Sequence, residues 1–378
     1  MTDQPVQVRA LELTDFRCYE HVSATLPDGV SVVIGSNGEG KTTLLEAVAW
    51  AALGQSFRGV PDAALVRTGE PRAVLRVELD ADGRTQQLEA EIHAAGRNRV
   101  LVNRRPLGRI RDLAGFLRVT IFSPDDLTLV KGGPAERRRY LDELLVGLTP
   151  RYEGTRSDYE RVLRHRNALL RGGLRDADAR TTLDVFDDQL TRAGSDLVRG
   201  RLRLVDRLAP AVDAAYRSLA GADARVSARY EAEWAGPEPL TVDEVEPRFR
   251  EALAARRRSE IDRGATLVGP HRDDWRLQID GLETRTQSSQ GEQRSLALAL
   301  RLAGHAVCEA VVGSAPVLLL DDVFSELDAT RAHALIDHLP KAQTLLTSAS
   351  NAIPEGIEPE RVWRIADGAL VPMEATRP

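Results

Sequence analysis

One short segment, GSNGEGKTTLLEAV at residues 35–48, constrains the possible folds of this chain more than any other. It fits the pattern G-x-x-x-x-G-K-[ST], in which backbone amides bind the phosphates of a nucleotide. The pattern is informative only between a strand and a helix, and both flanking segments fit. VSVVIG (30–35) is β-branched and apolar, and KTTLLEAVAWAAL (41–53) has apolar residues at helical spacing. We therefore predict a phosphate-binding loop here rather than a glycine-rich turn that matches by chance.

The loop residues have separate expected roles. Its glycines permit a tight turn, so that several N–H groups and the positive end of the next helix face the phosphates. Lys41 is expected to reach the β and γ phosphates, and Thr42 to offer its hydroxyl to Mg²⁺. The candidate nucleotide-binding residues are Gly35, Ser36, Asn37, Gly38, Glu39, Gly40, Lys41, Thr42 and Thr43.

A second segment, APVLLLDDVFSELD at residues 315–328, reads as a buried strand that ends in two acids. Ligands of open α/β sheets bind beyond the carboxyl ends of the strands, so these acids are expected to face the phosphates. We expect Asp321 to hold Mg²⁺ and Asp322 to act as the general base toward the attacking water. The alternative, that an aspartate here caps the next helix, suits Asp328 better.

Just before this strand, SSQGEQRSLALALRLAGHA (288–306) predicts a helix that follows a small polar turn. Hydroxyl and amide donors at a helix N-terminus form an anion site, and Ser289, Gly291 and Glu292 are the candidate residues. One chain needs only one phosphate cradle for its own nucleotide. A second cradle therefore indicates that the nucleotide of another molecule docks at this turn.

In this order the motifs resemble the ABC-type ATPase heads of transporters, SMC proteins and Rad50, and in particular the RecF family of bacterial repair and replication proteins. FSPDDLTLVKGGPAERRRYLD (122–142) and VGPHRDDW (268–275) carry the narrower resemblance. It implies an α/β fold with an antiparallel β layer, and a homodimer in which Ser289 and Gly291 contact the partner's γ-phosphate. Asp322, Lys41 and Ser289 are the implied catalytic residues, and SELD (325–328) matches the loop at the dimer interface.

Three departures from the wider ABC pattern affect the catalytic assignment. Asp322 stands where most ABC proteins carry glutamate, and an aspartate is one methylene shorter, which fits slow turnover. Ser348 stands where transporters have a switch histidine. The region SPDDL offers no glutamine for the loop that senses Mg²⁺ in transporters.

Between the two halves of the predicted site, residues 134–262 have a mainly helical pattern. We predict an ATPase head of residues 1–133 and 263–378, with residues 134–262 inserted as a helical lobe. Leu183, Leu190, Leu197 and Leu204 recur every seven residues, which fits either a coiled-coil seam or ordinary amphipathic packing. A helix of about 40 residues reaches roughly 60 Å, so the arm is expected to be far shorter than that of SMC proteins.

Composition limits how this chain can bind nucleic acid. With 51 basic against 57 acidic residues, binding through global charge is excluded, and a local basic patch is required. The candidates lie in the insertion, and an exposed helix of mixed charge is the alternative for each. They are Arg137, Arg138, Arg139, Arg161, Arg164 and Arg166.

Two further segments have open roles. Phe16 and Arg17 are expected either to touch the nucleotide, as in related heads, or to be a core residue and a surface charge. In VGPHRDDW (268–275) we expect a polar network that joins the lobes or lines the cleft, rather than a metal site.

The function that the resemblance implies is a weak, Mg²⁺-dependent ATPase of the cytoplasm. ATP closes a homodimer on duplex or gapped DNA, slow hydrolysis releases it, and RecR and RecO are the implied partners in loading a recombinase. The alternatives are an ATPase subunit of a transporter, an SMC-like chromosome protein, and a small-molecule kinase. Two distant cysteines indicate a reducing compartment, and the N-terminus shows no signal pattern.

Overall fold

The computed structural model describes residues 5–373, apart from 82, 174–176, 222, 351 and 367. Packing divides the chain into two units. Unit 1 consists of residues 1–126, 218–221 and 298–378, and unit 2 of residues 127–217 and 222–297. The sequence predicted an ATPase head of residues 1–133 and 263–378 and an inserted lobe of residues 134–262. That assignment of domains stays a prediction.

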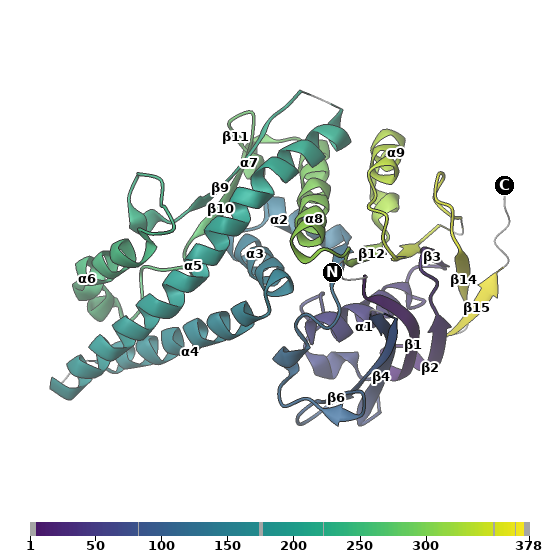
Figure 1. Cartoon of the computed structure of the whole chain (residues 1–378), viewed down its shortest axis with the longest axis horizontal. Coiled ribbons are helices and arrows are strands. Elements are labelled where there is room, and N and C mark those ends of the chain that lie inside the picture. The colour runs from purple at the N-terminus through teal and green to yellow at the C-terminus, as the bar shows by residue number, and fades with distance from the viewer. Residues whose placement is uncertain are drawn as a thin grey trace. The chain divides into compact units, whose positions relative to one another are not determined.

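Unit 1 contains an antiparallel sheet in the order β2-β1-β4-β5-β6-β7 (Figure 1). Buried and more exposed residues alternate along its long strands, because one face is covered by the core. β5 pairs with β6, and Gly96 in the turn between them has a φ of 106°. The strands are β1 (Gln7–Phe16), β2 (Tyr19–Thr25), β4 (Arg72–Ala81), β5 (Arg84–His93), β6 (Arg99–Val102) and β7 (Arg105–Pro106).

The second sheet of unit 1 is mainly parallel, in the order β15-β14-β3-β13-β12-β8. The strand before the phosphate loop lies between two strands that follow it by some 300 residues, and only β15 runs antiparallel to its neighbour. The strands are β3 (Val30–Ile34), β8 (Val119–Phe122), β12 (Val317–Asp321), β13 (Thr344–Ser348), β14 (Arg361–Ala366) and β15 (Ala369–Met373).

Helix α1 (Lys41–Leu53) lies between the two sheets and packs against β4, β12 and β13. Its sequence is apolar on nearly all sides, as expected of a helix that is covered all round. Trp50 is completely buried, and its indole N–H donates to Asp62 at 3.1 Å. The helix begins and ends at the residues predicted from the sequence.

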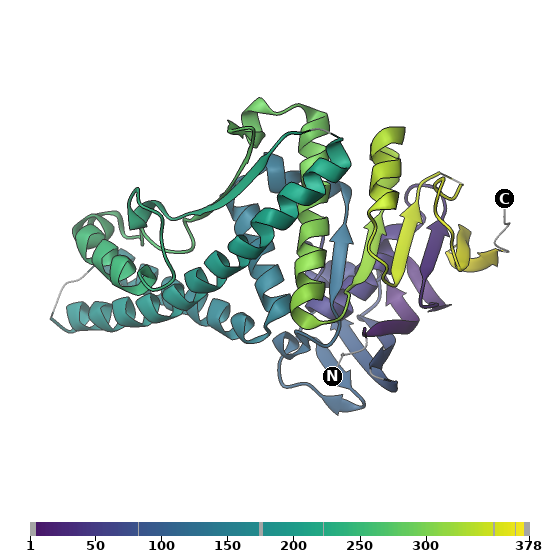
Figure 2. The same ribbon diagram turned by 45° about the horizontal axis from the view of Figure 1, so that its top comes forward.

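Short helices complete unit 1, and Figure 2 shows α9 beside the parallel strands. Asp328 is the N-cap of α9, and its carboxylate accepts from the amide of Arg331, which confirms the capping role. These helices are η1 (Asp62–Leu65), η2 (Ile110–Leu113), η3 (Pro124–Asp126), η5 (Val323–Glu326) and α9 (Ala329–Asp337).

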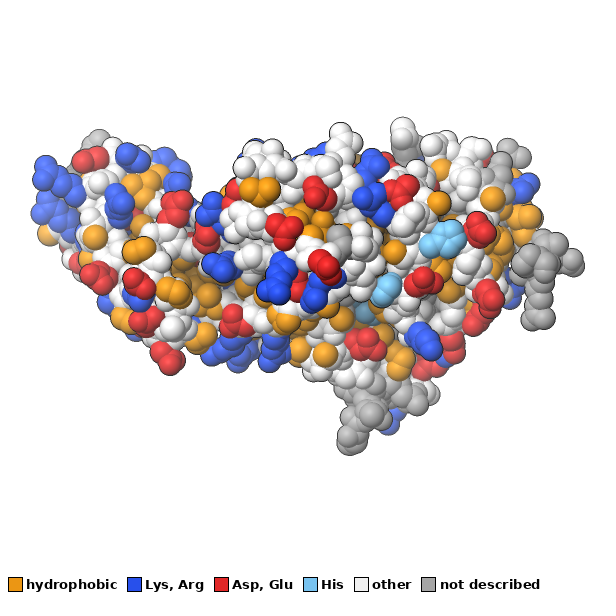
Figure 3. Space-filling model, turned by 90° about the horizontal axis from the view of Figure 1, so that it is seen from above, with side chains coloured by type: hydrophobic (Ala, Val, Ile, Leu, Met, Phe, Trp, Pro, Cys, Tyr) orange, Lys and Arg blue, Asp and Glu red, His pale blue; other side chains and the backbone are white. Residues whose placement is uncertain are grey.

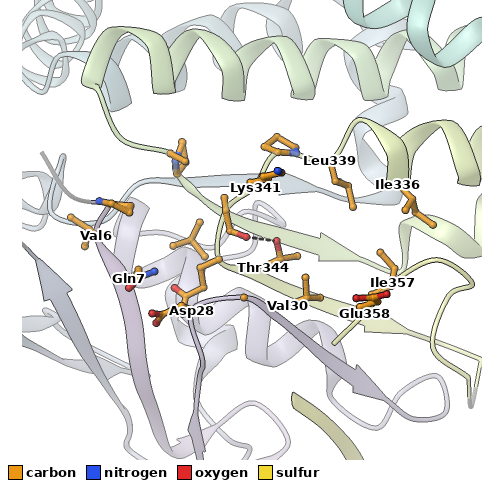
Figure 4. A pocket seen from close by; sticks show the side chains of 18 of the residues that line it. Val6, Gln7, Asp28, Val30, Ile336, Leu339, Lys341, Thr344, Ile357 and Glu358 are labelled. Atoms are coloured by element: carbon orange, nitrogen blue, oxygen red, sulfur yellow. Dashed lines mark hydrogen bonds between the residues drawn. The ribbon is translucent and has the colours of Figure 1, made fainter. Parts of the chain in front are cut away.

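A cavity of about 410 Å³ lies where β3, β12 and β13 begin, at the edge of the sheet opposite the phosphate loop. Its lining is largely apolar and includes Ile336, Leu339 and Ile357, which point into it in Figure 4. Gln343 is buried here, where its side-chain amide donates to the carbonyls of Val8 and Pro27.

Unit 2 consists mainly of helices, with the small sheet β11-β10-β9. The predicted long helix is confirmed as α5, but β9 interrupts the region expected to be helical. The elements are α2 (Leu127–Lys131), α3 (Pro134–Leu148), α4 (Arg151–Gly172), α5 (Ala177–Ala220), β9 (Val226–Glu231), η4 (Glu233–Ala235), α6 (Val245–Arg263), β10 (Asp274–Ile279), β11 (Leu282–Glu283) and α7 (Thr284–Gln287).

The leucines spaced by seven on α5 face the interior of unit 2, where each is at most 2% exposed. Two glycines of α5 let neighbouring helices approach closely. A Cβ on Gly194 would lie 2.5 Å from the ring of Phe249, and one on Gly200 would lie 2.6 Å from the ring of Tyr152. The repeat therefore reflects packing against α4 and α6 within one chain.

Helix α8 (Gln290–Val312) contributes residues to both units. By length and composition alone it is apolar enough to cross a membrane. However, 67% of its most apolar window is buried in the fold, as is usual for a core helix.

Candidate functional site

The phosphate loop occupies the turn between β3 and α1, and glycine is required there for two reasons. Gly38 and Gly40 have φ angles of 90° and 106°, in the left-handed region that other residues rarely adopt. A Cβ on Gly40 would also lie 2.6 Å from Cys18 Sγ and 2.9 Å from Tyr19 Oη. The backbone is thereby held close to β1 and β2.

Lys41 begins α1 and is only 6% exposed. Its ammonium donates to the carbonyl oxygens of Gly35 at 2.8 Å and Ser36 at 2.9 Å, and lies 3.5 Å from Asn37 Oδ1. The cation is therefore held across the loop by the loop's own acceptors. Three of the predicted nucleotide-binding residues, at positions 35–37, thus lie around this charge.

The acid-tipped strand meets the phosphate loop through a direct hydrogen bond. Thr42 Oγ1 donates to Asp321 Oδ1 at 2.8 Å, although the two residues are 279 positions apart in the sequence. Burial raises the pKa of the Asp321 carboxyl, while hydrogen bonds from Thr42 and Thr347 act in the opposite direction. The structure thus brings together the two residues predicted to hold Mg²⁺.

The donor set at this point fits Mg²⁺. A hydroxyl and a carboxylate are hard oxygen ligands, and Mg²⁺ bound with nucleotide uses only one or two protein ligands beside phosphates and waters. Within the described part of the chain no group of three or more His, Cys, Asp and Glu residues is placed to hold a metal.

Asp322 follows directly and adopts a left-handed backbone with a φ of 49°. Its amide donates to Thr347 Oγ1 at 3.0 Å, and its Oδ1 accepts from the amide of Ala349 at 3.0 Å. The candidate base is thus oriented by the loop after β13. Its catalytic role, like that of the other predicted site residues, stays a prediction.

Thr347 is a site residue that the sequence analysis missed. It is 1% exposed, donates to Asp321 Oδ1 at 2.9 Å and accepts from the amide of Asp322. The sequence could have indicated Thr347 as a site residue by its position at the end of a buried strand, one residue before Ser348. Ser348 itself is 7% exposed, and its hydroxyl bonds to Ser350 and Ala352 within its own loop.

A second missed residue is Arg58, whose charge is close enough to lower the pKa of Asp321. Its loop is tied to α1, because Ser56 donates to the completely buried Glu46 and accepts from the amide of Arg58. Arg17 also donates to Glu46, at 2.8 Å. The roles of Phe16 and Arg17 were open from the sequence. Phe16 is completely buried, and the guanidinium of Arg17 is held in this ion pair.

In unit 2, the predicted turn before α8 forms a capping box. Ser289 Oγ accepts from the amide of Glu292 at 3.3 Å, while the Glu292 carboxylate accepts from the amide of Ser289 at 2.6 Å. Ser289 is exposed, and Gly291 lies in the first turn of the helix. Ser289 Oγ accepts the hydrogen bond from Glu292, so its own proton can be donated to an anion. The carboxylate of Glu292 is occupied by the amide of Ser289 in the capping box.

The VGPHRDDW segment lies at the centre of a buried polar network in unit 2. Asp273 accepts from the Trp234 indole at 2.7 Å and from Tyr230, and Tyr159 bonds to His271 Nδ1 at 2.6 Å. Burial raises the pKa of Asp273 to about 6 and lowers that of His271 to about 4. These contacts fit the polar network expected from the sequence.

Two of the arginines proposed for DNA contact instead form ion pairs inside unit 2. Arg166 is completely buried and donates to Asp187 and Glu260, both at 2.7 Å. Arg137 is 8% exposed and forms a bidentate pair with Asp274, both bonds being 2.8 Å long. These two predictions are wrong, because sequence spacing alone could not show that acids face the helices inside the unit.

The sheets of unit 1 carry the phosphate loop and the acid-tipped strand, and unit 2 carries the serine-glycine turn. These features are those of an ABC-type ATPase head. The family model described as RecF/RecN/SMC N terminal domain matches residues 7–362. DNA replication and repair protein RecF of Beutenbergia cavernae is 45% identical over 384 residues, covering 94% of this chain and 97% of that protein. The chain belongs to the RecF/RecN/SMC N-terminal domain family and, within it, to the RecF proteins.

Further comparisons agree. DNA replication and repair protein RecF of Frankia alni is 46% identical over 352 residues, covering 90% of this chain and 93% of that protein. A solved structure of the recombination mediator protein RecF with ATP has a TM-score of 0.89 at 28% identity, over 98% of each chain. An Smc head bound to a domain of ScpA, with a TM-score of 0.58 at 14% identity over 98% of each chain, shares the fold.

Proposed function

We propose that this chain is an ATP-dependent DNA-binding protein of recombinational repair and replication, in which ATP binding closes a homodimer on DNA and slow hydrolysis reopens it. One observation carries the proposal. Thr42 of the phosphate loop and Asp321 of the acid-tipped strand share a hydrogen bond, as the two halves of a nucleotide-hydrolysing site require. A solved structure that is similar to this chain is of RecF with ATP, which supports ATP as the nucleotide.

In this proposal the loop amides and Lys41 bind the phosphates, while Thr42 and Asp321 hold Mg²⁺. The metal would neutralise phosphate charge during transfer. Asp322 accepts a proton from the attacking water, and Thr347 keeps both aspartates oriented. The amide of Ala349 donates to Oδ1 of Asp322 and orients the carboxylate, which has a second oxygen to accept the proton.

Dimerisation follows from the exposed turn at Ser289 in unit 2. Its hydroxyl and amides suit the γ-phosphate held by a second copy, so ATP supplies contacts that exist only in the dimer. ATP then acts as a switch, because the closed state gains those contacts and the open state does not.

DNA is proposed as the partner because the curated relatives are named as DNA replication and repair proteins. The chain as a whole is acidic, so contact must be local. Figure 3 shows Lys and Arg side chains gathered at the end of unit 2 where α6 lies in Figure 1. Arg256, Arg258 and Arg263 of α6 are exposed and take the place of the buried Arg137 and Arg166 as candidates. A cytoplasmic location, gapped DNA as a substrate and RecR and RecO as partners belong to the same proposal.

The test is fluorescence anisotropy of labelled duplex and gapped duplex, titrated without nucleotide, with ATP and with a non-hydrolysable analogue. Light scattering follows the oligomer. We expect dimers and DNA binding only with nucleotide, and the loss of both in Lys41→Ala. Dimers without DNA affinity would contradict the proposed partner, and ATP-driven dimers of Lys41→Ala would contradict the phosphate-loop assignment.

A further inference from the structure

Helix α1, which follows the phosphate loop, has no side-chain cap at its N-terminus. Its N-cap is Gly40, which offers no side chain to the amides of the first turn. The carbonyl of Gly40 accepts from the amide of Thr43 at 3.0 Å, whereas the amides of Lys41 and Thr42 come too early to find a partner within the helix. Amides at the N-terminus of the helix after a phosphate loop are the donors that bind phosphate.

A hydroxyl from another strand fixes the peptide that carries one of these amides. Tyr19 Oη donates to the carbonyl oxygen of Gly40 at 3.1 Å. This carbonyl and the N–H of Lys41 belong to the same planar trans peptide, in which the two groups point in opposite directions. The hydroxyl of Tyr19 therefore holds the amide of Lys41 on the side of the peptide that faces away from β2.

The position and chemistry of Tyr19 suit this role. The residue is completely buried at the start of β2 and pairs with Phe16 of β1, so the sheet sets the place of its ring. Burial raises the pKa of the Tyr19 hydroxyl above its ordinary value, so the group remains a donor at neutral pH. The peptide needs a fixed partner because glycine adopts positive and negative φ about equally readily, and Gly40 has a φ of 106°.

We propose that Tyr19 is a positioning residue of the nucleotide site: its hydroxyl orients the Gly40–Lys41 peptide so that the amide of Lys41 faces a bound phosphate. The inference rests on the proposed nucleotide site and adds a determinant of its affinity. Without the hydroxyl this peptide is free to rotate, and nucleotide binding must then order it at a cost in conformational entropy. ATP and ADP should be affected alike, since the loop amides bind the α and β phosphates that both nucleotides have.

One conservative substitution isolates the hydrogen bond. Tyr19→Phe removes the hydroxyl and keeps the ring that fills the space beside Gly40. The matched control is Tyr159→Phe, because Tyr159 is also buried and its hydroxyl bonds to His271 in unit 2. Thermal unfolding gives the midpoint of each protein, and dissociation constants for fluorescent ATP and ADP are measured well below it.

A spectroscopic signature separates the orientation of this peptide from a general loss of stability. The chain has three lysines, Lys41, Lys131 and Lys341, so protein labelled with ¹⁵N-lysine gives three backbone amide signals. The signal of Lys41 is the one that is missing in Lys41→Ala. In Tyr19→Phe we expect this signal to shift while the other two stay in place, and in the wild type ADP should also move it.

We expect Tyr19→Phe to bind ATP and ADP about fivefold more weakly than the wild type, which corresponds to about 1 kcal/mol. Tyr159→Phe should bind both nucleotides as the wild type does. Unchanged binding by Tyr19→Phe, or a Lys41 signal that either ADP or the substitution leaves in place, would overturn the inference and leave the proposed function intact. Failure of the wild type and of Tyr159→Phe to bind nucleotide would overturn both.

Discussion

At the scale of single residues, the site depends on one threonine that orients two aspartates. Thr347 donates to Asp321 and accepts from the amide of Asp322, and these two strand ends lie side by side because β12 and β13 are paired in parallel. The meeting of Lys41, Thr42 and Asp321 in one place could be predicted because each belongs to a local sequence pattern, and their roles stay predictions. Thr347 could not, because its partners are set by strand order and not by nearby sequence.

Asp322→Asn tests the base directly. Asparagine tolerates the left-handed backbone of this position, so the turn should survive the change. We expect ATP turnover to fall by about 100-fold because the amide cannot accept the proton. ATP binding should persist, and the closed dimer should become long-lived.

Steady-state hydrolysis and light scattering with ATP measure these effects. Asp337→Asn, an equal change of charge at an exposed position of α9, is the matched control. Turnover of Asp322→Asn at the wild-type rate would mean that another group accepts the proton.

At the scale of elements, close helix packing in unit 2 depends on two glycines of α5. Glycine is required at position 200 because the ring of Tyr152 occupies the space that a side chain would need. A periodic leucine pattern predicted the buried face of α5 correctly. It could not tell an intermolecular seam from internal packing, since both bury the same positions.

Gly200→Ala should therefore destabilise unit 2. The added Cβ would lie 2.6 Å from the Tyr152 ring, and overpacking of this kind costs about 1–3 kcal/mol. Gly154→Ala in α4 is the matched control, because its Cβ meets nothing within 4 Å. That control should stabilise by up to about 1 kcal/mol through helix propensity. Thermal unfolding with a lower midpoint for Gly154→Ala than for Gly200→Ala would contradict this packing.

In the VGPHRDDW segment, Asp273 and His271 should each make a contribution to the free energy of unfolding that depends on pH. Between pH 4 and 6, native Asp273 holds a proton that it loses on unfolding, so its contribution to stability falls as pH rises. Native His271 lacks a proton that it gains on unfolding, so its contribution rises with pH from about 4 to 6.5. The two contributions oppose each other in the wild type.

Single substitutions should expose each contribution. In Asp273→Asn only the histidine contribution remains, so stability should increase from pH 4 to 6.5. In His271→Gln only the aspartate contribution remains, so stability should decrease from pH 4 to 6. Either slope approaches about 1.4 kcal/mol per pH unit at most. Unfolding midpoints measured across this range decide the matter, and two variants with the same sign of slope would refute the assignment.

At the scale of the whole molecule, the two candidate phosphate cradles belong to different units, and the presence of a second cradle is the reason to expect a dimer. The S-x-G-E turn was predicted from four residues, because a helix N-terminus with a serine cap is a local feature. Buried ion pairs such as Arg166 with Glu260 were not predictable, because they join residues 94 positions apart.

Ser289→Arg should bind ATP as tightly as the wild type but remain monomeric, because the bulky side chain blocks the turn. Since loss of the cap costs about 1 kcal/mol, Ser289→Asp is the companion variant: it preserves the cap and repels a phosphate. Both should fail to dimerise in light scattering with ATP. An ATP-driven dimer of either variant would show that the turn is not at the dimer interface.

The position of β3 in its sheet has a consequence for synthesis of the protein. Both neighbours of this strand, β13 and β14, are translated some 300 residues after it. As the ribosome works through unit 2, β3 therefore has two open edges and no partner, a state prone to wrong pairing. A nascent chain that ends before β13 holds the whole phosphate loop but neither neighbour of its strand. Such a fragment should be a client for chaperones rather than a competitor for ATP.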